Sequence, residues 1–219
     1  MIKALVFDMD GLLLDSERIV QRSWNEAGEE FGVSGVGQQI YHTIGMNRKA
    51  RNAFFREVFG EEFPLEEFNK KSSEKFYQIV EREGLPVKTG AKELLTYAKE
   101  HGLKTAVATS SGKEYAVKVL EDAGLYGYFD GGVFGDMVHR SKPDPEIYLK
   151  ACAGIGKEPG ECLALEDAPA GVRSAHAAGL QVIVIPDLVA PEEEICALAF
   201  RQCKTLLDVI PILESGCCE

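Results

Sequence analysis

The sequence predicts an α/β protein with a parallel β-sheet and an inserted helical domain. Three observations predict this fold: short apolar runs recur along the chain, helix-like segments separate the later runs, and one long early segment contains helical patterns only. The chain has 219 residues, 45% of them hydrophobic, which is enough for one sizeable core and a smaller second domain.

The apolar runs predict the strands of the sheet. They are short, rich in Val, Leu and Ile, and do not alternate with polar residues, as is typical of strands that are covered on both faces. The expected strands lie at 2–7, 103–108, 162–166 and 181–185.

Helical patterns separate the later strands. The segments 92–102 and 171–179 each end on Gly, which suits the left-handed position that follows a helix. Strands and helices therefore alternate from about residue 86 onward. This order indicates parallel strands with helices on both faces of the sheet.

The segment 16–85 breaks this alternation. It contains three helical patterns, separated by Gly or Pro, and no strand pattern. We therefore expect an α/β core domain formed by residues 1–15 and 86–219, and a helical domain formed by residues 16–85. Asp15 and Ser16 are expected to cap the first helix of the insertion.

Composition narrows the classes of function. The formal net charge of −11 argues against broad binding to nucleic acids or anionic membranes, because these partners attract Lys and Arg. The first apolar run is interrupted by Asp8 too early for a signal peptide or membrane helix, so a cytoplasmic protein is expected. The cysteines lack paired CxxC spacing and are interpreted as reduced and mostly structural: Cys152, Cys162, Cys196, Cys203, Cys217 and Cys218.

Carboxylates follow the first apolar run directly, in VFDMDG. In an extended segment Asp8 and Asp10 point to the same side. A charge in a dry interior costs several kcal/mol unless it has a partner, so these acids need a cleft, a cation or a hydrogen-bonding group. Parallel sheets bind ligands at the carboxyl ends of their strands, which makes this segment a candidate site.

Polar residues also follow the later elements. Each candidate, taken alone, also has an ordinary structural interpretation. Asp8 and Asp10 could form a solvated turn or a helix cap, and Lys142 could be a surface lysine. Glu166 and Asp167 could cap the helix near Pro169. Their occurrence after several elements favours one shared site. The candidates are Thr109 and Ser110 in AVATSSG, Lys142 in SKPDPEIY, and Glu166 with Asp167 in LALEDAPAGV.

The segments FDMDG, VATSS, KPDP and LEDAPAGV resemble, in this order, the four motifs of the haloacid dehalogenase superfamily of phosphohydrolases. The resemblance spans nearly the whole chain. It implies a Rossmann-like core, and the helical insertion is similar to the C1 cap of the phosphoglucomutase-like branch.

The resemblance implies roles for the first motif. Asp8 is then the nucleophile that forms an aspartyl phosphate, which divides hydrolysis into two easier displacements. Asp10 is the general acid and base, because an alkoxide leaving group needs a proton and the attacking water must lose one. The dehalogenases of the family lack this second Asp, so its presence favours phosphoryl transfer. Gly11 lets the chain turn tightly beside the ligand.

The other motifs supply phosphate and metal ligands. The hydroxyl of Thr109, the backbone N–H of Ser110 and the ammonium of Lys142 are expected to hold the phosphoryl oxygens. Mg²⁺ suits carboxylates together with phosphate oxygen. Its expected ligands are Asp8, Asp167, the backbone carbonyl of Asp10, and Glu166 directly or through water.

The helical cap is expected to determine specificity. Val20 and Trp24 lie one helical turn apart and either line a pocket or pack inside the cap. Arg48 is at a position similar to an arginine that binds a distal phosphate in β-phosphoglucomutases, or is a solvated surface residue. Lys71 is a further candidate cation. Those mutases have His at the position equivalent to Val20, and this departure favours a phosphatase.

These patterns predict a Mg²⁺-dependent phosphatase that acts on a small phosphomonoester, such as a sugar phosphate or a nucleotide-like ester. A β-phosphoglucomutase-type mutase is the alternative. A non-catalytic or receiver-like phosphate-binding module is disfavoured, because receivers lack both the cap and the second Asp. The expected partner is a small phosphorylated metabolite, with no nucleic acid or membrane, and the expected state is a monomer.

Overall fold

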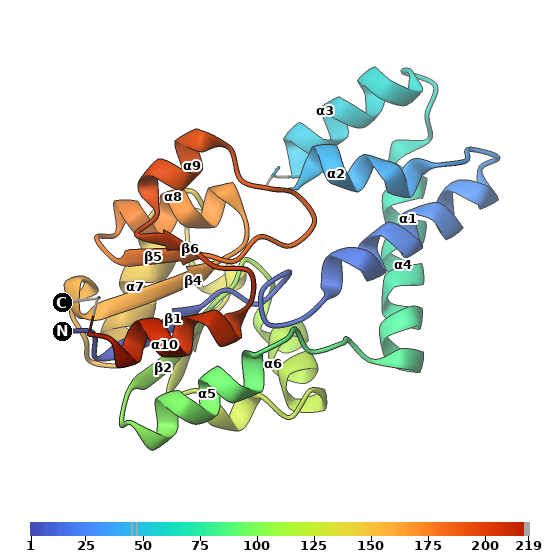
Figure 1. The fold of residues 1–219 in the computed structure, drawn as a ribbon. Helices are drawn as coiled ribbons and strands as arrows, with labels where there is room; N and C mark the ends of the chain where they lie inside the picture. The colour runs from blue at the N-terminus through green and yellow to red at the C-terminus, as the bar shows by residue number, and fades with distance from the viewer. Residues whose placement is uncertain (45, 47, 217–219) are drawn as a thin grey trace. The chain divides into compact units, whose positions relative to one another are not determined.

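The structure is a computed structural model that describes residues 1–44, 46 and 48–216 (Figure 1). The chain divides into two compact units. Residues Met1–Asp15 and Pro86–Glu219 form one of them, called here the α/β unit, and Ser16–Leu85 form the other, called the helical unit.

The α/β unit contains a parallel sheet with the strand order β3-β2-β1-β4-β5-β6. The expected fold class, an α/β protein with a Rossmann-like parallel sheet, is confirmed. Four of the strands coincide with the apolar runs of the sequence, whereas β3 and β6 were not predicted. The strands are β1 (Ala4–Phe7), β2 (Lys104–Ala108), β3 (Gly131–Val133), β4 (Cys162–Glu166), β5 (Gln181–Val184) and β6 (Arg201–Gln202).

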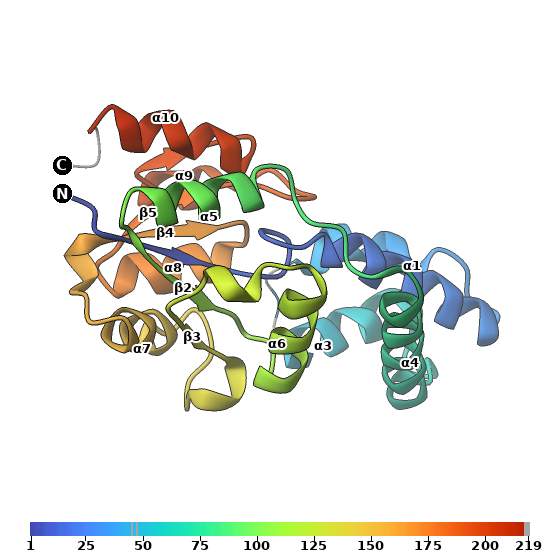
Figure 2. The same cartoon turned by 90° about the horizontal axis from the view of Figure 1, so that it is seen from below.

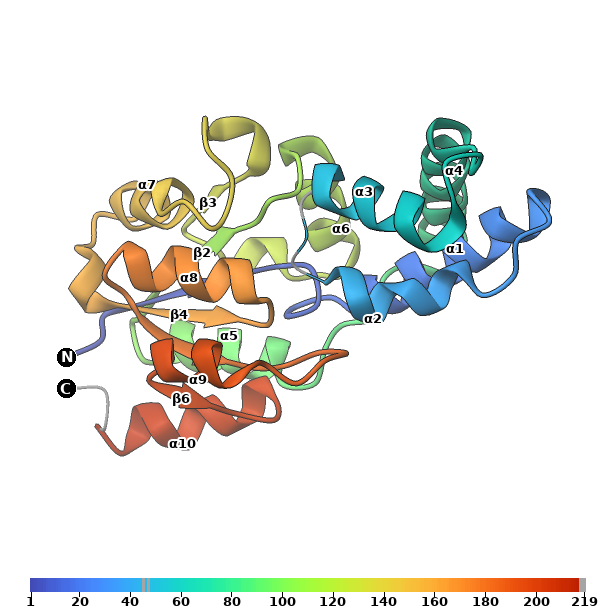
Figure 3. The ribbon, with the colours of Figure 1, turned by 90° about the horizontal axis from the view of Figure 1, so that it is seen from above.

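Helices cover both faces of this sheet (Figures 2 and 3). On one face, α7 (Glu146–Gly154) and α8 (Pro169–Ala177) bury apolar side chains against alternate strand residues. On the other face lie α5 (Ala91–Glu100) and α10 (Val209–Glu214). Both faces of the central strands are therefore apolar, which explains why their sequences do not alternate. The remaining helices of the unit are α6 (Lys113–Asp122) and α9 (Glu193–Leu198).

The central position of β1 determines where the site forms. Phe7, its last residue, is in register with Val107 of β2 and with Leu165 of β4. Because the strands are parallel, the residues that follow them meet at one edge of the sheet. Asp8 and Thr109, which follow β1 and β2, and Glu166, the last residue of β4, are brought together in this way.

The helical unit contains α1 (Ser16–Glu30), α2 (Ile40–Thr43), α3 (Arg48–Phe59) and α4 (Leu65–Glu83). Its core is aromatic. The Phe55 ring is fully buried, and its centroid lies 5.1 Å from that of Trp24 and 5.6 Å from that of Phe68. Removing such a ring typically costs about 3–5 kcal/mol. At the surface, Arg22 of α1 donates two hydrogen bonds to Glu83 of α4.

The cysteines within the described residues form no disulfide. Cys152, Cys162 and Cys203 are buried, and Cys196 is half-buried. Cys217 and Cys218 lie outside the described residues. No helix in the described part of the chain has both the length and the apolar character that a bilayer crossing requires.

Candidate active site

A buried ion pair lies at the carboxyl edge of the sheet. Asp8 follows β1 directly, and its backbone N–H donates a hydrogen bond to the Leu165 carbonyl. Lys142 Nζ lies 2.5 Å from Asp8 Oδ1 and donates to the Ala108 carbonyl at 2.9 Å. The side chains of Lys142 and Asp8 are 7% and 10% exposed. The sheet therefore holds a carboxylate and an ammonium in contact in a largely water-excluded position.

Glu166 is the second partner of this lysine. Its Oε1 lies 2.6 Å from Lys142 Nζ and accepts a hydrogen bond of 2.5 Å from the Tyr148 hydroxyl. The backbone N–H of Ala168 donates to its other oxygen at 3.4 Å. A Cβ atom at Gly171 would lie only 1.9–2.1 Å from the Glu166 carboxylate, so this helix position admits no side chain. Glu166 is thus enclosed and fixes the ammonium toward Asp8.

Burial and neighbouring charges shift the pKa values of this group. Burial raises the pKa of Asp8, an effect that the Lys142 ammonium opposes and the nearby carboxylates reinforce. Burial alone would lower the pKa of Lys142, but the carboxylates of Asp8 and Glu166 outweigh it and raise the pKa. Burial, followed by the charge of Glu166, holds the pKa of Tyr148 well above its ordinary value. The lysine is therefore a fixed positive charge and the tyrosine a neutral donor.

The carboxylates of Asp8, Glu166 and Asp167 form a donor set that fits a divalent cation. One oxygen from each of these residues lies within 4.8 Å of the others. Such hard oxygen donors suit Mg²⁺. Three carboxylates face one ammonium here, so a cation would also offset the excess negative charge. Gly11, with φ +81°, lets the chain pass close to this set, because a Cβ at this position would lie 2.2 Å from Asp167 Oδ2.

Asp10 lies beside hydroxyl groups of the segment that follows β2. Ser111 Oγ donates a hydrogen bond of 2.8 Å to Asp10 Oδ2, and Thr109 Oγ1 donates one of 3.3 Å to the same oxygen. The structure therefore brings Thr109 to the side chain of Asp10, while the side chain of Ser110 is exposed. This exposure agrees with the expected role of Ser110, which involves its backbone N–H and not its side chain.

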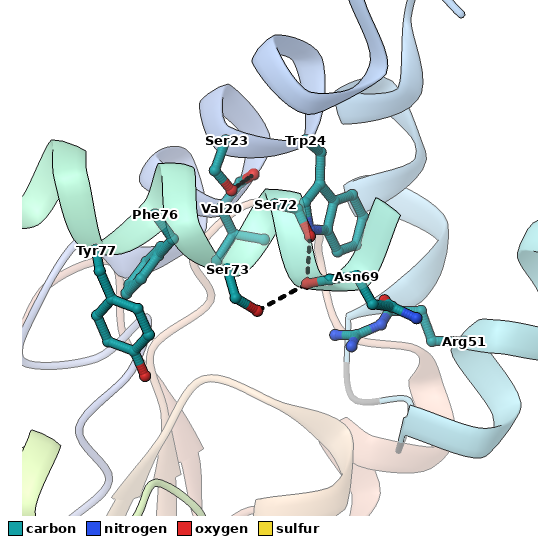
Figure 4. A pocket seen from close by; sticks show the side chains of 9 residues that line it. All are labelled: Val20, Ser23, Trp24, Arg51, Asn69, Ser72, Ser73, Phe76 and Tyr77. Carbon is teal, nitrogen blue, oxygen red and sulfur yellow. Dashed lines mark hydrogen bonds between the residues drawn. The ribbon is translucent and has the colours of Figure 1, made fainter. Parts of the chain in front are cut away.

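Two of the cap candidates line a pocket within the helical unit (Figure 4). Its volume is ≈ 220 Å³. Val20 and Trp24 of α1 contribute an apolar wall, and the Arg51 guanidinium lies over the Trp24 ring at 5.6 Å from its centroid. The remaining lining residues are mostly polar: Ser23, Asn69, Ser72, Ser73, Phe76 and Tyr77.

The other two cap candidates have different positions. Lys71 is on the surface of the helical unit, where it forms ion pairs with Glu30 at 3.2 Å and Glu74 at 3.5 Å, and it is not among the residues that line the pocket. Arg48 is the first residue of α3, and its side chain lies outside the described residues. The cation within the pocket lining is Arg51, which the sequence analysis did not select.

Ser111 and Tyr148 also escaped the sequence analysis. Ser111 had a detectable signal, because residues two apart in an extended segment share a side and Thr109 was already a candidate. Tyr148 had none, since an aromatic residue in an amphipathic helix is read as core. Its ring is indeed buried, and its hydroxyl donates a hydrogen bond to Glu166. Lys142 Nζ also lies 3.5 Å from this hydroxyl and 5.0 Å from the ring centroid, so two residues of the site contact Tyr148.

Comparison with known proteins gives consistent matches. The family model of haloacid dehalogenase-like hydrolases matches residues 2–179. The chain is 34% identical over 193 residues to YhcW of Bacillus subtilis (strain 168), with 86% of each chain covered. It is 31% identical over 182 residues to the phosphorylated carbohydrates phosphatase of Thermotoga maritima, which covers 83% of this chain and 84% of that protein.

A solved structure extends the similarity to the fold. A variant of CbbY from Rhodobacter sphaeroides, in complex with xylulose-(1,5)bisphosphate, superposes with a TM-score of 0.75 at 29% identity. The alignment covers 95% of this chain and 96% of that one. The family model spans well over half of the sequence, and the resemblance found in the four motifs is confirmed. The chain therefore belongs to the haloacid dehalogenase-like hydrolases and is an enzyme of that family.

Proposed function

We propose that this enzyme is a Mg²⁺-dependent phosphatase that hydrolyses a small phosphomonoester, a sugar phosphate or a nucleotide-like ester, through an aspartyl phosphate on Asp8. The observation that carries the proposal is the contact of Lys142 with both Asp8 and Glu166, at 2.5 Å and 2.6 Å, beside a carboxylate set that suits a metal ion. The phosphatase activity named for the Thermotoga maritima relative supports it.

In the first step a carboxylate oxygen of Asp8 attacks phosphorus, and the bond from phosphorus to the ester oxygen breaks. Lys142, the Thr109 hydroxyl and the Ser110 backbone N–H hold the non-bridging oxygens of the transferring group. Because Lys142 is already fixed by Glu166, its charge needs little reorganisation as the transition state forms.

Asp10 moves the protons in both steps. It gives a proton to the departing alkoxide and then takes one from the water that attacks the aspartyl phosphate. This water supplies the oxygen of inorganic phosphate, and the carboxylate of Asp8 is regenerated. The hydroxyl groups of Thr109 and Ser111 hold Asp10 in place in the structure.

The metal ion would be held by Asp8 and Asp167, with the Asp10 backbone carbonyl and Glu166 as further ligands. Bound Mg²⁺ offsets the repulsion between the Asp8 carboxylate and the phosphate anion. Of these residues, Glu166 already accepts hydrogen bonds from Lys142 and Tyr148. Glu166 would therefore contribute to the metal through water, while Asp8 and Asp167 would bind it directly.

We propose that the pocket of the helical unit recognises the organic part of the substrate, the alcohol to which the phosphate is esterified. Its polar lining and its Trp24 wall suit a hydroxyl-bearing carbon skeleton, since aromatic faces pack on C–H groups and hydroxyl and amide groups hydrogen-bond to oxygen. Arg51 adds a donor for an electronegative group. Val20 supplies an apolar surface where the mutases of the family have a histidine.

A phosphosugar mutase of the β-phosphoglucomutase type is the second candidate. It would share the α/β unit and the aspartyl phosphate, but it must deliver a sugar hydroxyl to that intermediate in place of water. Val20 lines the pocket and can neither donate nor accept a proton, which favours hydrolysis.

The proposal is tested by phosphate release from a panel of sugar phosphates and nucleotides, with and without Mg²⁺. Release that depends on Mg²⁺ and disappears in the Asp8→Asn variant would support it. Metal-independent release, or release that survives Asp8→Asn in protein purified free of other phosphatases, would contradict it.

A further inference from the structure

We propose that Ser111 is the positioning residue that orients Asp10 for proton transfer while substrate is bound. The inference rests on the proposed function, because it assigns Asp10 the part of acid and base. It gives a defined task in the reaction to the Ser111 hydroxyl. Ser111 lies in the segment VATSS, but the family resemblance assigned its side chain no role.

The geometry singles out one oxygen of Asp10. Ser111 Oγ lies 2.8 Å from Oδ2, a strong hydrogen bond to a carboxylate, and the Thr109 hydroxyl lies 3.3 Å from the same atom. Both contacts hold Oδ2, which fixes the plane of the carboxyl group and orients Oδ1 as the oxygen that exchanges the proton.

The two hydroxyl groups become unequal once a phosphate binds. A hydroxyl carries a single hydrogen and can donate it to one acceptor at a time. If the Thr109 hydroxyl donates to a phosphoryl oxygen, as its proposed role requires, it no longer donates to Asp10. Of the two hydroxyl groups, that of Ser111 then continues to donate to Asp10 Oδ2.

The backbone of Ser111 is fixed well enough for this task. Its N–H donates to Thr109 Oγ1 at 3.1 Å, and its carbonyl accepts a hydrogen bond of 2.8 Å from the backbone N–H of Gly135. A Cβ at Gly135 would lie 2.0 Å from the carbonyl oxygen of Ser110, so the two segments pass in direct contact. Ser111 thus presents its hydroxyl from a fixed position, which is the condition for orienting another group.

The test compares two esters of similar size that differ in their need for an acid. Phenolate leaves poorly without a proton, whereas p-nitrophenolate leaves readily. We use kcat/KM, because it reports the steps up to departure of the leaving group and excludes the later attack of water. The variants are Ser111→Ala, which removes the donor, and Ser111→Thr, which keeps it.

Ser111→Ala is expected to lower kcat/KM for phenyl phosphate about tenfold, which is the scale of one hydrogen bond to a charged group. The kcat/KM for p-nitrophenyl phosphate should change less than about twofold. Ser111→Thr should restore the wild-type ratio between the two esters. Ser111→Cys keeps the size of the side chain with a weak donor and carries the same expectation as Ser111→Ala, should the latter fail to fold.

A double-mutant cycle identifies the route of the effect. If Ser111 acts through Asp10, Ser111→Ala should not change the ratio of the two esters further when Asp10→Asn is already present. Equal losses on both esters, no loss on either, or additive effects in the cycle would overturn the assignment while leaving the phosphatase intact. A wild-type enzyme that releases phosphate from neither ester nor any member of the panel would overturn the proposed function and this assignment together.

Discussion

Lys142 Nζ lies 2.5 Å from Oδ1 of Asp8, and neither side chain is more than 10% exposed. A buried lysine that lost its only partner would destabilise the fold, since an uncompensated buried charge costs several kcal/mol. Lys142 has Glu166 and the Ala108 carbonyl as further partners. A substitution that abolishes the reactivity of Asp8 therefore leaves Lys142 with its contacts to Glu166 and to the Ala108 carbonyl.

The first prediction concerns Asp8→Asn. The amide keeps the shape of the carboxylate but is no nucleophile, so turnover should fall to background. The unfolding temperature should stay within a few degrees of wild type, because Lys142 retains Glu166. Phosphate release and a thermal melt measure the two effects, and a fully active variant would refute the assignment of the nucleophile.

Asp10→Asn should separate substrates by their leaving groups. Loss of a general acid typically costs about 10²–10⁴-fold, and this loss should fall on kcat/KM for alkyl phosphates far more than on p-nitrophenyl phosphate. The ratio of the two values in wild type and variant is the measurement. An unchanged ratio would mean that Asp10 contributes to the site without acting as the acid.

Removal of divalent metal should abolish activity, and Mg²⁺ should restore it. Asp167→Ala should weaken Mg²⁺ binding, because it removes one of three converging carboxylates. Titration calorimetry measures this affinity independently of turnover. Asp122→Ala is a matched control, since Asp122 is an exposed acid that pairs with Lys118 at the surface. Full activity after thorough chelation would exclude the metal model.

The presence of Val20, where the mutases of the family have a histidine, predicts hydrolysis and not isomerisation. With β-glucose 1-phosphate and a bisphosphate primer, the wild-type enzyme should release phosphate and sugar with little glucose 6-phosphate. Water needs only Asp10 as its base, whereas a mutase must exclude water and present a sugar hydroxyl. A coupled glucose-6-phosphate dehydrogenase assay beside phosphate release gives both rates. Isomerisation faster than hydrolysis would reverse the proposed function and leave the fold unaffected.

Gly171→Ala should destabilise the protein although Ala favours helices over Gly by roughly 1 kcal/mol. The added methyl group would meet the buried Glu166 carboxylate, and overpacking of this kind costs about 1–3 kcal/mol. Activity should fall as well, because Glu166 fixes Lys142. Gly154→Ala in α7 is the control, since a Cβ there meets nothing within 4 Å. Denaturant unfolding of both variants decides the question, and equal stability would contradict the steric argument.

The sequence predicted the elements whose residues carry a strong signal. The central strands are apolar throughout, so their existence could be read directly, and the four motifs follow them in order. β3 contains Gly131 and Gly132, and β6 consists of Arg201 and Gln202, so neither has an apolar run to detect. Their places depend on the neighbouring strand, which the sequence does not reveal.

Site residues could be predicted only where the residue type is unusual for its place in the sequence. Carboxylates after a buried strand are costly and therefore conspicuous, which is why Asp8 and Asp10 were found. Tyr148 and Arg51 have ordinary positions in helical patterns, and only the packing of the folded chain shows what they contact. Ser110 and Ser111 are neighbours of the same type, and the direction of the backbone decides which hydroxyl reaches Asp10.

The short outer strands also have a consequence for the behaviour of the protein at high concentration. A sheet edge exposes unpaired N–H and C=O groups that can recruit a strand from another molecule. Here β3 has three residues, two of them glycine, and β6 has two exposed polar residues, Arg201 and Gln202. Such edges offer a poor template for intermolecular pairing. β3 and β6, the two strands without an apolar run in the sequence, therefore protect the apolar interior strands from aggregation.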